Sequence, residues 1–174
     1  MYCETIEINN KKFIGTLDFW VLRKVQEDIE KVDKFYTMSQ LFKRISDVNN
    51  IDMRIITSIL YFSIIRKNND SDIEKVFMED ELNLEKFNSI FNYINLLLKK
   101  CMPLKENISE NLFEEEDLGI EIKEDWDFDY MEYIWNSILN RTNFYKTTPK
   151  NFFSQVKVYK DVNKIKDDEE VTYL

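Results

Sequence analysis

The scarcity of turn-forming residues constrains this sequence most. Only two glycines and two prolines occur in 174 residues, and alanine is absent. A sandwich or barrel of short strands needs a turn about every 8–12 residues, and glycine and proline supply many such turns. We therefore expect a mainly α-helical fold of a few long elements. The length favours one domain, or one domain with a small appendage.

The missing histidine and the placing of the cysteines remove many enzyme classes. Without His there is no imidazole base and no imidazole metal ligand. Cys3 and Cys101 form no C-x-x-C pair and have no His to activate them. Two glycines leave little scope for a phosphate-binding loop. We expect no enzymatic activity, no metal and no cofactor.

Nothing in the sequence predicts a targeting or membrane segment. The N-terminus lacks the basic and apolar regions of a secretory signal. The longest apolar runs are too short and too polar to span a bilayer. We therefore expect a cytoplasmic protein with no membrane partner.

The first residues predict a β-hairpin that leads into a helix. Residues 5–8 alternate in polarity, an Asn9-Asn10 pair follows, and a second short apolar run ends at Gly15. We expect Thr16 to cap a helix over 17–32. The residues expected to show the 3.6-residue period of that helix are Trp20, Lys24, Val25, Asp28, Ile29 and Val32.

Helical spacing of apolar residues predicts four more helices before residue 103. The isoleucine-rich stretch is apolar around most of its circumference, so we expect it to be the central buried helix. Ser71 and Glu74 have the spacing of a capping box. Pro103 should end the last of these helices. The expected ranges are about 39–48, 51–67, 71–78 and 84–100.

An acidic segment divides the chain. Residues 101–125 carry nine acidic and two basic side chains, and so supply most of the net charge of −9. Like-charged runs repel each other and stay hydrated, so we interpret 103–125 as a linker. The alternative is a mimic of nucleic acid, or a docking tail for a basic partner. The expected organisation is a helical body over 1–102, the linker, and a small helix–loop–helix over 126–174.

The C-terminal part is rich in aromatic residues. We expect a helix over about 127–140, a loop, and a second helix that Thr148 caps and Pro149 begins. A two-helix unit cannot bury all ten aromatic side chains of 126–159 within itself. They either dock on the body or are offered to another protein. The candidate partner-binding residues are Trp126, Phe128, Trp135, Phe144, Tyr145, Pro149, Phe152 and Phe153.

Two other interpretations of this part are weaker. Asp125, Asp127 and Asp129 have the spacing that opens a calcium loop, but the required Gly and Glu further on are missing. Capping of the helix by Asp127 explains them better. The second helix could lie in a groove of DNA, with Lys150, Lys157 and Lys160 contacting the phosphates. We expect no nucleic acid, because residues 126–174 carry eight acidic and seven basic side chains and so have no strong positive charge.

Three features together resemble phage tail assembly chaperones, the family found with long-tailed phages, prophages and tail-like bacteriocins. The first is the opening IEINNKKFIGTLDFWVLRKVQEDIEK, a strand pair that runs straight into an amphipathic helix. The second is the helical body with IITSILYFSIIRKNND. The third is DWDFDYMEYIWNSILNRTNFYKTTPKNFF, an aromatic helix, a loop and a Thr-Pro helix start followed by two phenylalanines.

The resemblance implies a non-enzymatic protein of the bacterial host cytoplasm. The body would coat the long tape-measure protein, and the C-terminal part would recruit tail tube subunits. Self-association would be compatible with both roles. Two alternatives stay open: a DNA-binding transcriptional regulator that uses residues 126–160, and a structural tail completion protein.

Overall fold

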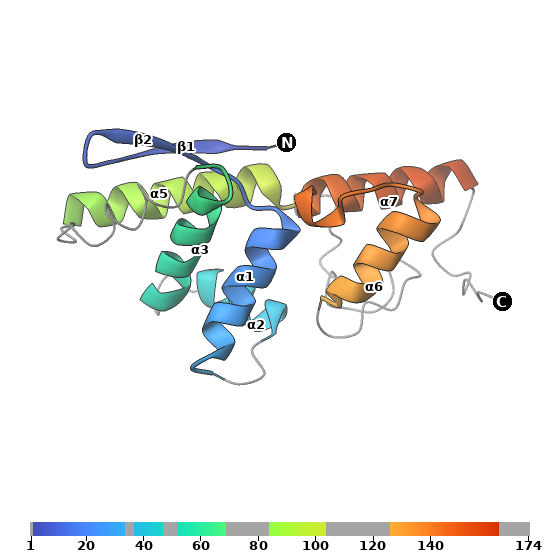
Figure 1. Ribbon diagram of the computed structural model, residues 1–174, viewed down its shortest axis with the longest axis horizontal. Helices are drawn as coiled ribbons and strands as arrows, with labels where there is room; N and C mark the ends of the chain where they lie inside the picture. The colour runs from blue at the N-terminus through green and yellow to red at the C-terminus, as the bar shows by residue number, and fades with distance from the viewer. Residues whose placement is uncertain (1, 34–36, 47–51, 69–83, 104–125, 164–174) are drawn as a thin grey trace.

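The computed structural model describes residues 2–33, 37–46, 52–68, 84–103 and 126–163. The protein is mainly helical and begins with a two-stranded antiparallel hairpin, as expected. Figure 1 shows the hairpin lying along one edge of the molecule beside α5, with α1, α2 and α3 below it. The last two labelled helices, α6 and α7, lie at the other end, and α5 and α7 meet nearly end to end.

The hairpin joins β1 (Glu4–Ile8) to β2 (Lys11–Gly15) through a two-residue turn. Asn9 and Asn10 both adopt left-handed backbone, with φ of 51° and 61°. Positive φ at both central residues is the geometry of a type I′ turn, whose twist matches that of the paired strands, and asparagine tolerates it well. The register places Ile6 opposite Phe13, and both side chains are buried.

The end of the hairpin is held close to α3 (Met53–Ile65) and α5 (Leu84–Cys101). The Thr16 amide donates to the carbonyl of Ser63 at 3.2 Å, and the Ser63 hydroxyl pairs with the Tyr93 hydroxyl at 3.0 Å. Gly15 lies against this pair, where a Cβ would overlap the Tyr93 hydroxyl. Burial raises the pKa of Tyr93, so its hydroxyl keeps its proton.

Gly15→Ala should therefore destabilise the protein by about 1–3 kcal/mol, because the new methyl group would overfill this contact. Tyr93→Phe removes the overlapping oxygen and leaves Ser63 its bond to the Leu60 carbonyl. The double variant should thus cost less than the sum of the two single changes, as measured by urea unfolding. Simple additivity would contradict this packing.

Helix α1 (Phe19–Glu30) begins later than expected, and its cap is Asp18 rather than Thr16. The Asp18 carboxylate accepts from the Val21 amide at 3.0 Å, whereas the Thr16 hydroxyl donates to the Tyr2 carbonyl at 2.7 Å. The expected apolar face was also partly wrong, since Val32 is exposed. The buried side chains of α1 are Phe19, Val21, Leu22, Val25 and Ile29.

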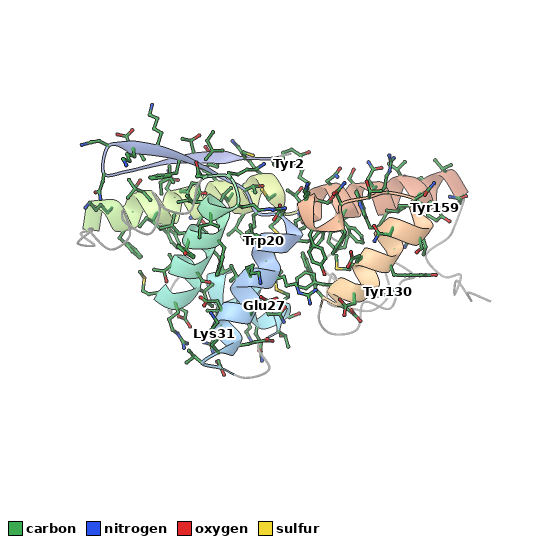
Figure 2. All side chains as sticks on the ribbon, in the orientation of Figure 1. Tyr2, Trp20, Glu27, Lys31, Tyr130 and Tyr159 are labelled. Atoms are coloured by element: carbon green, nitrogen blue, oxygen red, sulfur yellow. The ribbon has the colours of Figure 1, made fainter. Side chains whose placement is uncertain are left out.

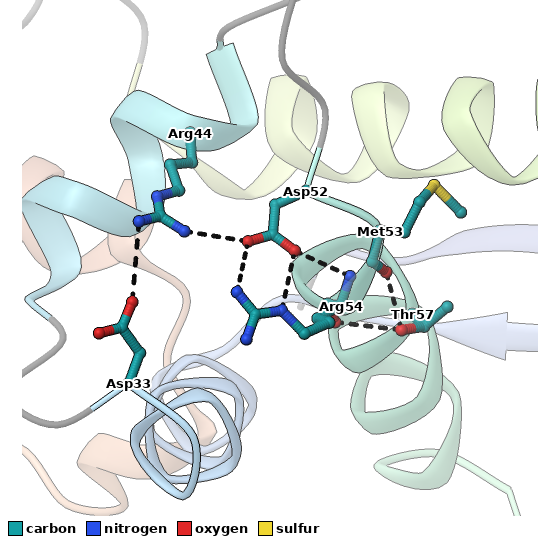
Figure 3. A network of polar contacts seen from close by, with 6 residues as sticks. All are labelled: Asp33, Arg44, Asp52, Met53, Arg54 and Thr57. Atoms are coloured by element: carbon teal, nitrogen blue, oxygen red, sulfur yellow. Dashed lines mark hydrogen bonds and ion pairs between the residues drawn. The ribbon is translucent and has the colours of Figure 1, made fainter.

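Helix α2 (Met38–Ser46) is tied to the start of α3 by the Asp52 carboxylate (Figure 3). Asp52 caps α3 by accepting from the Arg54 amide, and its oxygens also bind the guanidinium groups of Arg54 and Arg44 at 3.0 Å. The hydrogen bond from the Arg54 side chain is the main reason why the pKa of Asp52 lies below its ordinary value. Helix α3 is buried over most of its surface, as expected for a central helix.

The C-terminal helices agree with the predicted order but differ in detail. Helix α6 (Phe128–Tyr133) passes into a π-helical turn, η2 (Ile134–Ile138), and the loop contains a 3₁₀ turn, η3 (Phe144–Lys146). Helix α7 (Pro149–Asn163) begins at the proline, as expected. Thr148 does not cap it through its side chain, because the almost fully buried hydroxyl has no hydrogen-bond partner in the described part of the chain.

Three predictions fall outside the described residues. They concern the capping-box helix over 71–78, the acidic segment apart from its first residues, and the last residues of the chain.

Candidate protein-binding site

The aromatic side chains of the C-terminal part gather around one residue of the body, Phe19. The Phe19 ring stacks on the Phe144 ring, with centroids 4.3 Å apart and planes 18° apart. The rings of Phe152, Phe128 and Trp126 surround it at centroid distances of 5.6, 5.9 and 6.0 Å. Offset-stacked and edge-on pairs of this kind add to the stabilisation from burial.

This aromatic cluster joins the two parts of the described chain. Trp126 also contacts Phe42 of α2 at 5.1 Å and Phe153 of α7 at 5.7 Å, so the cluster is bounded by α1, α2 and α7. Figure 2 shows side chains filling the space between α1 and α6. Docking on the body thus explains how most of the aromatic side chains that the two-helix unit cannot bury alone become buried.

Six of the eight candidate partner-binding residues are buried here. Tyr145 and Phe153 lie at the edge and are half-buried. In the docked arrangement the buried six offer almost no surface to another protein. They are Trp126, Phe128, Trp135, Phe144, Pro149 and Phe152.

Local geometry explains how the C-terminal side chains are aimed. Asp127 caps α6 by accepting from the amides of Asp129 and Tyr130, as the sequence predicted. The π-helical turn carries Trp135, whose indole N–H donates to the Thr142 carbonyl at 3.0 Å while its ring lies 6.0 Å from Phe152. This bond satisfies the polar atom of an otherwise buried ring.

A polar rim holds the turn η3 against α1. The Phe19 amide donates to the Thr147 carbonyl at 3.0 Å. The Arg66 guanidinium donates to the Tyr145 carbonyl at 3.4 Å, and Arg23 donates to the Tyr145 hydroxyl. Arg23 also lies over the Tyr145 ring, 5.6 Å from its centroid.

The rim rests on a buried ion pair. The Asp18 carboxylate has no exposed surface and accepts from Arg66 Nε at 2.8 Å. Burial raises the pKa of Asp18, and the bonds from Arg66 and the Val21 amide oppose that rise without cancelling it. A carboxyl whose pKa rises on folding makes the protein less stable as the pH rises through the folded-state pKa.

Sequence reasoning missed Phe19, Phe42 and Arg66. Phe19 lies next to Trp20, and the expected helical period includes Trp20 instead. The available signal for Phe19 was its helical spacing, because Phe19, Leu22, Val25 and Ile29 follow one another at intervals of three, three and four residues. Helical spacing with Leu41 and Ile45 puts Phe42 on an apolar helix face, but no local pattern gives its contact with Trp126 or marks Arg66, because those partners lie far along the chain.

The surface of the body offers a second aromatic feature. Trp20 is half-buried, with the Arg66 guanidinium 5.0 Å from its ring and the Phe62 ring edge-on at 6.3 Å. The exposed large apolar side chains of the described C-terminal part are Tyr133 on α6 and Val158 and Val162 on α7, at 51%, 52% and 73% of their surface. The Trp20 ring and these C-terminal side chains are therefore apolar groups that are accessible to solvent.

The lysines of the DNA-binding interpretation do not form one outward basic face on α7. Lys150 lies over the Tyr2 ring, 5.3 Å from its centroid, and Lys160 is buried. Lys157 is exposed. This placement gives the DNA-binding interpretation no support.

The thiol of Cys101 is a poor nucleophile. The residue is fully buried, and burial raises the pKa of its thiol to about 11. We expect a Cys3→Ser variant to react with a disulfide reagent at pH 8 at least about tenfold more slowly when native than when denatured. Equal rates would show that Cys101 is accessible.

The described residues also contain no group of three or more Cys, Asp or Glu side chains that could hold a metal ion. None of the described helices is long and apolar enough to cross a membrane. No protein-family model, curated protein or solved structure matches this chain.

Proposed function

We propose that this protein is a non-enzymatic assembly chaperone that binds another polypeptide during phage tail assembly. Its body would hold the tape-measure protein, and its C-terminal part would recruit tail tube subunits. The sequence resemblance suggests these partners. The hairpin that runs directly into α1 agrees with the first feature of that resemblance.

The half-buried ring of Trp20 carries the proposal. Tryptophan and arginine dominate the binding energy of protein interfaces, and here Arg66 stacks on Trp20 while Phe62 supports its edge. The ring is therefore held in place before any partner arrives, which lowers the entropy cost of binding. A long amphipathic helix needs an apolar surface of this kind to stay in solution.

Co-expression with the tape-measure protein tests the proposal. The full chain should raise the soluble fraction of the tape-measure protein, and Trp20→Ala should reduce that effect while thermal unfolding shows an intact fold. Tyr133→Ala is the matched control, because it removes an exposed aromatic side chain at the other end of the molecule. Precipitation of the tape-measure protein to the same extent with and without the chain would remove the proposal.

Tube recruitment is the second half of the proposal. Among the described residues of the docked C-terminal part, the exposed large apolar side chains are Tyr133, Val158 and Val162, so these residues would make the contact. Val158→Asp should abolish capture of tube subunits and leave the tape-measure effect unchanged. Persistence of this chain in purified particles would instead favour a structural completion protein.

A further inference from the structure

The turn η3 meets the body as a peptide ligand meets a receptor. The body contacts four features of it: the Phe144 ring, the Tyr145 hydroxyl, and the main-chain carbonyls of Tyr145 and Thr147. Lys146, between them, is exposed. The contacts therefore select the side chains at the first two positions of the turn and leave the third exposed, and the fourth, which is buried, accepts a hydrogen bond through its carbonyl.

The receptor side is positioned by the body itself. The Phe19 amide is in the first turn of α1, where a helix offers its N–H groups no internal acceptor. Arg66 is held by the Asp18 carboxylate and by the Trp20 ring. Arg23 is paired with Glu27 on the same helix at 3.3 Å. These donors would keep their places if the turn left.

Among the described residues, the docked arrangement leaves one hydrogen-bonding group next to the turn without a partner. The Thr148 hydroxyl, which directly follows it, is 2% exposed and has no hydrogen-bond partner within the described ranges. A buried hydroxyl without a partner costs about 1–3 kcal/mol. A partner segment without a hydroxyl at this position would not carry that cost.

We propose that the Phe19 surface of the body is a recognition site for an aromatic peptide segment, Phe-Tyr followed by two residues, which residues 144–147 occupy in cis. A partner polypeptide with the same chemistry competes for the site. The phenylalanine ring of the partner stacks on Phe19, and its tyrosine hydroxyl accepts a hydrogen bond from Arg23. Its main-chain carbonyls accept hydrogen bonds from the Phe19 amide and Arg66. Binding of that partner releases the aromatic cluster. This inference does not depend on the tail-assembly role.

A labelled peptide with the sequence of residues 141–149 tests the proposal by fluorescence anisotropy. The attached turn has an effective concentration in the range of about 1 mM, so the native chain should bind the peptide weakly. Full-length Tyr145→Ala loses the Arg23 contact in cis and should bind the peptide at least about tenfold more tightly. Phe144→Ala, a second variant, should do the same if circular dichroism shows that it folds.

Peptide variants provide the controls. A peptide with alanine at both aromatic positions should not bind. In an Arg23→Ala chain, a peptide with Phe in place of its Tyr should bind as well as the original, because the hydroxyl has lost its donor. Equal binding of the aromatic and alanine peptides would overturn the proposal. So would no binding to folded Tyr145→Ala at about 1 mM peptide. A dimer of the native chain that the peptide dissociates would make a second copy the occupant, which also contradicts it.

Discussion

Phe19→Ala should lower the free energy of unfolding by about 3–5 kcal/mol, the largest effect expected of a single change in this protein. The Phe19 ring has no exposed surface and contacts four other rings, so its removal leaves a cavity at the centre of the aromatic cluster. The loss should also release the C-terminal part from the body, because these rings form the contact between them.

Urea unfolding followed by tryptophan fluorescence measures this effect, since Trp126 and Trp135 report on the cluster. Phe42→Ala is the matched control: it also removes a ring in contact with Trp126, but a half-buried one at the edge. The control should cost clearly less than Phe19→Ala. A Phe19→Ala cost no greater than that of the control would mean that Phe19 is not the centre of the joint.

Arg66→Ala should cost about 3 kcal/mol at neutral pH, because it leaves the Asp18 carboxylate buried without its cation. Arg66 also contacts Trp20 and the Tyr145 carbonyl, so the change loosens both aromatic features. Lys31→Ala, which breaks an exposed pair with Asp28, is the control and should cost less than about 1 kcal/mol.

The cost of Arg66→Ala should also depend on pH. Without Arg66 the pKa of Asp18 rises further, so the variant loses more stability than the native chain as the pH increases through that pKa. The difference between the two proteins should therefore be largest at pH 7 and shrink towards pH 4, where Asp18 takes up a proton. If the stability difference between the native chain and Arg66→Ala stays constant over this pH range, the buried charge left without a partner is not that of Asp18.

Local signals account for the parts of the fold that the sequence predicted well. The Asn9-Asn10 turn, the Asp127 cap and the proline start of α7 each depend on residues within a few positions of one another. Helix α5 has the expected range to within one residue. In these places the backbone preference and the pattern of polarity agree, so no distant contact is needed to choose between structures.

Long-range packing decided what the sequence could not. Phe19 and Trp20 are neighbours, and both could have faced the core; the rings of Phe144 and Phe152 decide in favour of Phe19. Tyr93 was not recognised as a core residue because its partners, Ser63 and Gly15, come from two distant elements. The π-helical turn at 134–138 likewise has no local sequence signal.

The central claim is that the aromatic residues of 126–163 serve first as a docking surface for the chain's own body. Hydrogen exchange of the Phe19 amide tests it most directly, because this N–H has no acceptor within α1 and is bonded to the Thr147 carbonyl across the joint. This amide should exchange as slowly as the buried amides of α3. Exchange at the rate of an unprotected amide, with α3 still protected, would contradict it.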